Sequence, residues 1–197
     1  APAGGLIPNA WRPTILAAIQ RRMDIVSGMH QFLCDDAEFA AAAAPADVRL
    51  VDVRQNDARH LTRRRDINER CLRIHTVGHD CNCGKMVVTL ELAMALQRLD
   101  HDAKFVATGQ TGIMIEGWGV SVDRVISHFI HGTAAWLVEQ PEDIGDWLFV
   151  AGQGSIAHPP YSAVPLAAVH GPTPPPLVLL PPPARPGHFR CGHTTRA

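Results

Sequence analysis

The stretch from Gly78 to Lys85 contains residue types that could bind phosphate. It reads GHDCNCGK, so a glycine opens it and a Gly-Lys pair closes it. Such a loop can point successive backbone N–H groups at an anion, and the lysine adds a mobile positive charge. The apolar run 71–77 predicts a strand before the loop. Residues 86–99 predict a helix after it, whose N-terminal end also favours an anion. This order is that of a P-loop.

Two features of the loop depart from the common P-loop motif. Five residues separate Gly78 from Gly84, so His79 occupies the position of the usual first glycine. This spacing, with an Asp in the loop, also occurs in loops of the dethiobiotin-synthetase type. Met86 stands where a Ser or Thr normally presents a hydroxyl to magnesium, which argues against Mg-dependent hydrolysis of a nucleoside triphosphate. The alternative is an ordinary strand-to-helix turn with a solvent-exposed lysine.

Two more glycine-rich loops follow predicted strands. Thr108–Gly112 (TGQTG) follows the apolar run 103–107, and Gly152–Ser155 (GQGS) follows the run 147–150. Open α/β sheets bind ligands at the carboxyl ends of their strands, so we expect both loops to line the site; plain turns are the alternative. Ala151 stands where many P-loop proteins carry an acid that holds metal.

Composition limits the class of protein. The 197 residues suffice for one large domain, or one domain and part of another, and 46% hydrophobic content with 19% charged residues predicts a folded core. The net charge of -1 gives no reason to expect nucleic acid or an anionic membrane as partner. There is no signal-peptide pattern and no apolar run of the roughly 20 residues that span a bilayer. Five cysteines, an odd number, suggest reduced thiols and a cytoplasmic location.

The first 55 residues predict part of a Rossmann-like domain. We expect a helix over 11–22, a strand over 23–27, an alanine-rich helix and a strand over 48–53. Asp35 with Glu38 resembles a capping box that opens the second helix, and Pro45 is expected to end it. An opening strand would lie before residue 1. Because the chain begins without Met, we expect a fragment or a processed form.

The rest of the chain predicts a P-loop NTPase-like α/β domain with a parallel sheet over 71–197, after an arginine-rich linker over 56–70. The run Arg63–Arg65 could hold a phosphate or RNA backbone, but a solvated linker is favoured. The last elements are expected to be a helix over 158–168, a strand over 177–180 and a proline-rich tail. Two helices are expected to carry apolar stripes, one of Val88, Leu92, Ala95 and Leu99, the other of Val122, Val125, Ile126, Phe129, Ile130, Thr133 and Leu137.

Other chemistries are weaker alternatives. His75, His79, Cys81 and Cys83 could form a zinc cluster, but the spacing is poor and one histidine falls within a strand, so we expect no metal site. A helix N-terminus and Lys85 would lower the thiol pKa of Cys81 or Cys83, but no partner base is evident. Ser155 and His158 lack the glycine pattern and the third partner of a hydrolase triad.

Several segments together resemble a known family. They are MDIVSGMHQFLCDDAEF, VRLVDVR, VGHDCNCGKM, LELAMAL, FVATGQTGIMIEGWGVSVD, WLFVAGQGSIAHPPYS and LVLLPPPARPGHFR. In this order they are similar to a P-loop family long catalogued as a domain of unknown function, some of whose members are described as D-glutamate N-acetyltransferases. The family's loop also has Met after Gly-Lys. The resemblance implies transfer of an acetyl group from acetyl-CoA to the amine of a D-amino acid, with D-glutamate the expected acceptor. We expect a homo-oligomer that acts on small molecules.

The resemblance also implies roles for individual residues. The expected cofactor contacts come from three loops: Gly78, His79, Cys81, Asn82, Cys83, Gly84, Lys85 and Met86; Gln110, Thr111 and Gly112; and Gln153, Gly154 and Ser155. The catalytic candidates are Lys85 and a general base, either Asp80 or His158. The chain departs from the family pattern at Ala151 and His128, where an acid is usual, and at Val87, where Thr is usual. The rival functions are a ligase or kinase of the dethiobiotin-synthetase type that uses Mg-ATP, and a non-catalytic nucleotide-binding module.

Overall fold

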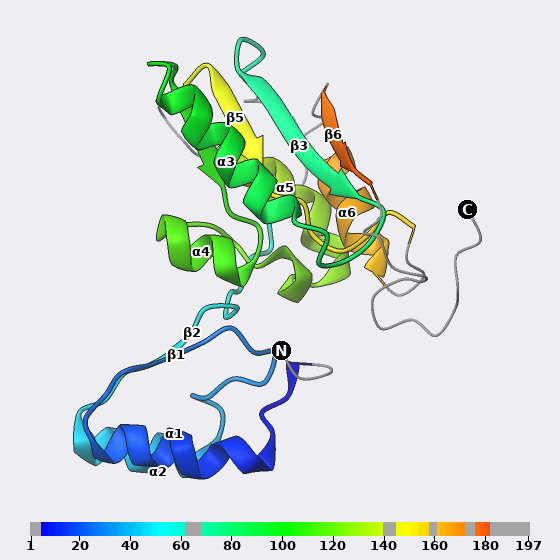
Figure 1. Cartoon of the computed structure of the whole chain (residues 1–197). Helices are drawn as coiled ribbons and strands as arrows, with labels where there is room; N and C mark the ends of the chain where they lie inside the picture. Colours follow the sequence, from blue (N-terminus) through cyan, green and yellow to red (C-terminus); the bar gives the residue numbers. More distant parts are fainter. Residues whose placement is uncertain (1–4, 62–67, 140–144, 158–160, 172–175, 182–197) are drawn as a thin grey trace. The chain divides into compact units, whose positions relative to one another are not determined.

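The structure of the chain is a computed structural model that describes residues 5–61, 68–139, 145–157, 161–171 and 176–181 (Figure 1). The chain forms two compact units, Ala1–Asn56 and Asp57–Ala197. Each has its own sheet, in which every strand pair is parallel. The predicted α/β class is therefore confirmed.

The first unit alternates helices with short strands in the predicted order. Its elements are η2 (Asn9–Trp11), α1 (Arg12–Gln20), β1 (Ile25–Ser27), α2 (Ala37–Ala46) and β2 (Leu50–Asp52). The two strands pair with Ile25 opposite Leu50. The helices cover this sheet through one apolar cluster that includes Ile19, Leu33 and Phe39.

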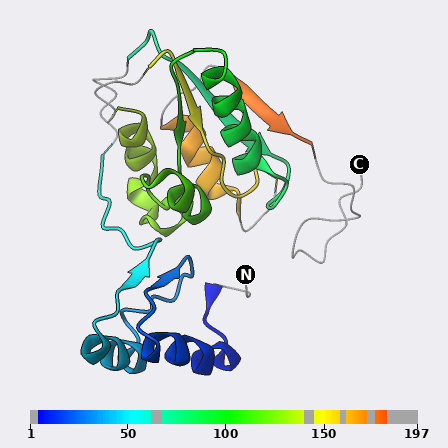
Figure 2. The same ribbon diagram turned by 60° about the vertical axis from the view of Figure 1, so that its left-hand side comes forward.

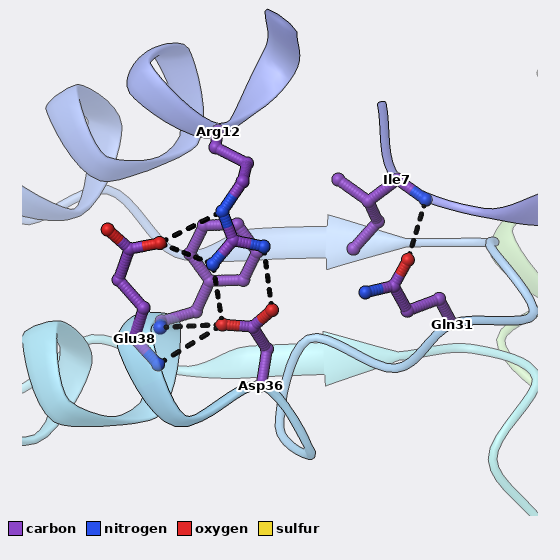
Figure 3. A network of polar contacts seen from close by, with 6 residues as sticks. Ile7, Arg12, Gln31, Asp36 and Glu38 are labelled. Atoms are coloured by element: carbon purple, nitrogen blue, oxygen red, sulfur yellow. Dashed lines mark hydrogen bonds and ion pairs between the residues drawn. The ribbon is translucent and has the colours of Figure 1, made fainter. Parts of the chain in front are cut away.

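Polar contacts fix the start of α2 (Figure 3). The N-cap is Asp36 rather than the expected Asp35, because the Asp36 carboxylate accepts from Glu38 N at 3.1 Å and Phe39 N at 3.3 Å. The same carboxylate accepts from Arg12 Nη1 at 2.7 Å, and Arg12 also pairs with Glu38. The guanidinium lies over the Phe39 ring, 4.4 Å from its centroid. One arginine thus ties α1 to the first turn of α2.

The end of α2 differs slightly from expectation. Pro45 lies inside the last turn, and the helix ends one residue later. Asp47 adopts a left-handed conformation (φ 55°), and Val48 N bonds back to Ala43 O at 3.2 Å. Asp47 N bonds to Ala44 O at 3.3 Å, which completes a Schellman motif. The C-terminal cap, and not the proline, ends the helix.

The second unit contains a four-stranded parallel sheet in the order β4-β5-β3-β6. Its elements are β3 (Leu72–Gly78), α3 (Lys85–Gln97), β4 (Ala103–Val106), α4 (Gln110–Glu116), η3 (Val122–Arg124), η4 (Ser127–Phe129), α5 (Ile130–Glu139), β5 (Trp147–Val150), α6 (Ala163–His170) and β6 (Leu177–Leu180). The strand β3, which carries the glycine-lysine loop, lies inside the sheet between β5 and β6.

Helices cover both faces of this sheet (Figure 2). One core cluster joins Phe105 and Phe149 to Ala93 of α3. The other joins Val106 and Leu148 to Leu137 of α5. Alternate residues of each strand therefore pack into the apolar layers on opposite faces of the sheet, as expected for a parallel sheet buried on both sides.

The single helix predicted to carry the apolar stripe from Val122 to Leu137 is broken in the structure. Two 3-10 turns precede α5, and Val125 is extended between them (ψ 139°). Val122 N donates to Thr108 O at 3.0 Å, so this backbone is hydrogen-bonded to the segment just after β4 and not within a helical turn. Most of the predicted stripe is buried even so, but Ile126 is 61% exposed.

The apolar stripe predicted on α3 is wrong. The face buried against the sheet consists of Met86, Thr89, Leu90, Ala93 and Leu96. Leu92 is 37% exposed and Leu99 is 68% exposed. The helix has apolar residues on two faces, and the face in register with the buried Lys85 is the one that packs.

Part of the predicted linker packs on the folded units. Just before the linker, Arg54 is buried and donates to Gly28 O at 2.7 Å within the first unit. In the second unit, the His60 ring stacks on Trp136 with ring centroids 4.4 Å apart. The arginine run at 63–65, His158 and the tail beyond Pro181 lie outside the described residues.

Candidate functional site

The phosphate loop, residues 78–85, connects the end of β3 to the first residue of α3. Asn82 (φ 54°) and Gly84 (φ 94°) are both left-handed, which lets the backbone curl back toward the strand. A Cβ on Gly78 would lie 2.6 Å from Cys83 Sγ and 3.0 Å from Lys85 Cδ. The loop therefore folds tightly over the end of the strand, and a larger residue at Gly78 would have to displace the side chains of Cys83 and Lys85.

Lys85 points into this loop. The residue is 6% exposed, and its Nζ donates to Asp80 O at 2.7 Å and lies 3.5 Å from Cys83 Sγ. The alternative of a turn with a solvent-exposed lysine does not describe this arrangement. The cation is held next to the loop backbone, where an anion bound by the N–H groups would meet it.

Asp80 orders the loop. It is 1% exposed, and its Oδ1 accepts from Cys81 N at 2.6 Å, while its carbonyl receives the Lys85 ammonium. This is the geometry of a local side-chain turn. Of the two predicted bases, Asp80 lies in the described part of the chain; His158 lies outside it.

The segment after β5, residues 152–156 and here called the β5 loop, is bonded to the phosphate loop. Ser155 Oγ donates to His79 O at 2.5 Å, and Ile156 N donates to Gly78 O at 3.1 Å. Ser155 is fully buried. At the other end, a Cβ on Gly152 would collide with Thr76 O. The structure thus brings the predicted residues of these two loops together.

The third predicted loop is the start of a helix. Gly109 is the N-cap of α4, so Gln110, Thr111 and Gly112 form its first turn. The amide of Gln153 lies against Gly109, where an added Cβ would be 2.5 Å from Gln153 Nε2. The β5 loop therefore contacts both the phosphate loop and the residue that begins α4.

Two buried threonines behind the loop were not foreseen from the sequence. Thr76 Oγ1 accepts from Gly152 N at 2.9 Å and lies 2.7 Å from Thr89 Oγ1. Thr89 Oγ1 donates to Lys85 O at 2.6 Å. The spacing of Thr89, four residues after Lys85, is the one signal in the sequence that could have placed it beneath the lysine.

His75 does not lie in a metal-binding arrangement. It is fully buried in β3, and burial lowers its pKa to about 4. Among the described residues neither ring nitrogen makes a hydrogen bond of normal geometry, although the Val150 backbone is close enough to oppose the fall in pKa slightly. Within the described part of the chain, no group of three or more His, Cys, Asp or Glu side chains could hold a metal ion.

The positions that depart from the family pattern lie in different surroundings. Ala151 is 1% exposed and belongs to the core cluster under α3. Val87 is exposed on α3, and His128 is exposed in η4. Met86 also packs toward the same core cluster as Ala151. The position that often presents a hydroxyl to magnesium thus contributes an apolar side chain to the core.

Sequence comparison assigns the chain to a family. Residues 56–193 match a domain of unknown function described as the DUF1611_C P-loop domain, and residues 1–56 match the DUF1611_N Rossmann-like domain. The chain belongs to the DUF1611 family. The resemblance to this two-domain family is therefore confirmed, and the phosphate loop described above lies in the domain that the family defines as a P-loop domain.

Two curated relatives of this DUF1611 chain carry a name. Both are called D-glutamate N-acetyltransferase and are 37% identical: one from Pseudoalteromonas sp over 91% of this chain, one from Tritonibacter scottomollicae over 92%. The chain covers 53% and 54% of these proteins, so it spans about half the length of the curated relatives it matches. A crystal structure of a DUF1611 family protein from Anabaena variabilis is similar, with a TM-score of 0.88 at 34% identity, covering 98% of this chain and 56% of that one.

Among the described residues, no helix has both the length and the apolar character needed to cross a membrane.

Proposed function

We propose that the phosphate loop binds the phosphate groups of acetyl-CoA and that the chain takes part in N-acetylation of a D-amino acid, D-glutamate above all. The names of two relatives at 37% identity support the reaction. The observation that carries the binding site is the enclosed Lys85, which lies at the N-terminus of α3 with its ammonium against the loop backbone.

The donor set of the loop fits a phosphate ligand. It combines a lysine cation, backbone N–H groups around two left-handed residues and the first turn of a 13-residue helix. Coenzyme A offers a pyrophosphate and a ribose phosphate, and their binding requires no hydrolysis. The packed Met86 and the buried Ala151 leave no hydroxyl or acid at the usual magnesium positions. This favours acetyl-CoA over Mg-ATP.

We assign the roles as follows. The wall around the phosphates consists of residues of the phosphate loop and the first residues of α3: Gly78, His79, Cys81, Asn82, Cys83, Gly84, Lys85 and Met86. The neighbouring strand ends are lined by Gln110, Thr111, Gly112, Gln153, Gly154 and Ser155. Acetyl-CoA supplies the acetyl group. A base must take a proton from the acceptor amine, and Asp80 and His158 are the candidates. Coenzyme A leaves as its thiol after acetyl transfer, and Lys85 serves as the cation nearest the coenzyme A phosphates.

Calorimetric titration with coenzyme A tests the binding site. Replacing Lys85 with alanine removes a charge-assisted hydrogen bond worth about 1.5–3 kcal/mol, so we expect coenzyme A to bind about 10- to 100-fold more weakly. The matched control is Lys104→Ala, which removes the other lysine of the chain, in β4. We expect this control to bind coenzyme A like the wild type.

Titration with Mg-ATP separates the rival function. Binding of Mg-ATP that depends on Lys85, without any coenzyme A signal, would overturn the proposal in favour of a nucleotide-using ligase or kinase. Equal loss of coenzyme A binding in the Lys85 and Lys104 variants would also count against the assigned site.

A further inference from the structure

A chain of buried hydroxyl groups links the phosphate loop to the β5 loop. It runs from Gly152 N through Thr76 Oγ1 and Thr89 Oγ1 to Lys85 O, with successive distances of 2.9, 2.7 and 2.6 Å. Both threonines are fully buried. We call this set of four groups the hydroxyl relay. It joins Gly152 to Thr76 across 76 positions of the sequence.

The number of available protons shows which hydroxyl of the relay donates and which accepts. The Thr89 proton goes to Lys85 O, because a carbonyl can only accept. The 2.7 Å contact between the two hydroxyls therefore uses the Thr76 proton. That leaves the Thr76 oxygen to accept from Gly152 N. Thr76 Oγ1 also lies 3.4 Å from Lys85 O, which is a second and more distant acceptor for its proton. Each hydroxyl thus both donates and accepts, and such chains strengthen cooperatively in a low-dielectric interior.

The two ends of the relay lie in the two loops of the proposed site. Lys85 begins α3 and closes the phosphate loop. Gly152 begins the β5 loop, and the next residue, Gln153, places its amide against Gly109. The backbone at Gly152 packs directly against the Thr76 carbonyl, which leaves no room for a Cβ, so Gly152 lies close to the strand at this point.

We infer that Thr76 and Thr89 are positioning residues that transmit anion binding at the phosphate loop to Gly152 and Gln153. This inference rests on the proposed phosphate binding. An anion bound to the N–H groups of the first turn of α3 polarises the Lys85 carbonyl and restricts its motion. The hydrogen bonds of the hydroxyl relay then stabilise the position of the Gly152 amide. Ser155 and Ile156 are hydrogen-bonded directly to His79 and Gly78, so anion binding affects them without the relay.

Residue-resolved hydrogen exchange with and without pyrophosphate tests the relay in the full chain. In the wild type we expect pyrophosphate to slow exchange at the Gly152 and Ile156 amides. In Thr76→Val, Gly152 loses its acceptor, so its amide exchanges about tenfold faster and no longer responds to pyrophosphate. Ile156 keeps its response in this variant, which shows that the anion is still bound.

Three further variants exclude a merely structural effect. Thr76→Ser keeps the hydroxyl and should restore the response of Gly152. Thr76→Val/Thr89→Val should match Thr76→Val alone, because the Thr76 hydroxyl makes the bond to the Gly152 amide and its loss already disconnects that amide from Thr89 and from Lys85 O. Thr133→Val is the matched control: Thr133 is also fully buried, but its hydroxyl has no hydrogen-bond partner among the described residues. We expect this variant to respond like the wild type.

The outcomes also separate this inference from the proposed function. A Gly152 amide that still responds to pyrophosphate in Thr76→Val, or that never responds in the wild type, overturns the relay. Coenzyme A binding that depends on Lys85, with an unresponsive Gly152, leaves the proposed function in place and removes the relay. A Gly152 response to pyrophosphate that Thr76→Val abolishes, in a chain that does not bind coenzyme A, supports the relay and overturns the proposed function.

Discussion

The two units of this chain use different polar chemistry for similar tasks. In the first unit, charged groups fix a helix start: Arg12 bonds Asp36 and Glu38 at the surface (Figure 3). In the second unit, neutral threonine hydroxyls link the strand, the helix and the β5 loop, and they are fully buried. The side chains of Arg12 and Asp36 are 24% and 13% exposed.

The difference follows the cost of desolvation. A charge that keeps contact with water can form an ion pair at modest cost, whereas burial of an ionised group is expensive unless it is fully compensated. Hydroxyl groups can be buried when each donates and accepts. We therefore expect the first unit to respond most to loss of its ion pairs, and the second to loss of shape or of a hydroxyl. Each unit also contains a group with a shifted pKa, Asp36 in the first and His75 in the second, so both should lose stability in acid.

The largest effect should come from adding one carbon to the β5 loop. In Gly152→Ala the new Cβ collides with the Thr76 carbonyl, which is strand backbone and cannot move aside. We expect a loss of more than about 3 kcal/mol in the free energy of unfolding, measured by denaturant titration. The control is Gly117→Ala, where no atom lies within 4 Å and only the left-handed φ of 78° opposes the substitution. That variant should lose about 1 kcal/mol.

The second effect concerns the one histidine buried in β3. Because burial lowers the pKa of His75 from 6.5 to about 4, the unfolded chain binds more protons than the folded chain between these pH values. Stability therefore falls as the pH drops from about 6.5 to about 4, and the full effect is about 3 kcal/mol.

Thermal unfolding as a function of pH measures the histidine's contribution. His75→Leu should flatten the slope between pH 6.5 and 4, whereas the exposed His128→Leu should not. An unchanged slope in His75→Leu would show that the acid sensitivity of the second unit comes from other groups.

The smallest effect separates two adjacent acids of the first unit. Hydrogen bonds from Arg12, and from the N–H groups of α2, hold the pKa of Asp36 at about 2. Asp36→Ala should destabilise the first unit by about 1–2 kcal/mol, as loss of an N-cap does. Asp35→Ala should have little effect. Hydrogen exchange in peptides from α1 and α2 would report both effects. The Asp36 contribution should decline as the pH falls from about 4 to about 2, the interval between its ordinary pKa and its pKa in the folded chain.

Features encoded in neighbouring residues were predictable from the sequence. The strand before Gly78, the loop and the helix after Lys85 form one continuous pattern, and the structure places β3 and α3 there. The alternation of helices and strands in the first unit was predictable for the same reason. The site residues named from the loops are brought together at the strand ends, but their roles remain proposals.

Features that depend on distant partners were not predictable. Asp35 and Asp36 satisfy the same capping pattern, and the pairing of Arg12 with Asp36 distinguishes them. Two faces of α3 are apolar, so periodicity alone could not choose which one faces the sheet. In the sequence, Thr76 resembles any other strand residue. Its role depends on the hydrogen bond from Gly152, which lies far along the chain.

The two-stranded sheet of the first unit has a consequence for handling the chain. Among the described residues, β1 pairs only with β2, so each strand has an outer edge without a strand partner. Val26 and Val51, opposite each other in the register, are 56% and 40% exposed. Open edges with exposed β-branched side chains are the usual starting points for strand addition between molecules. In concentrated solution, self-association of this chain should begin at β1 and β2.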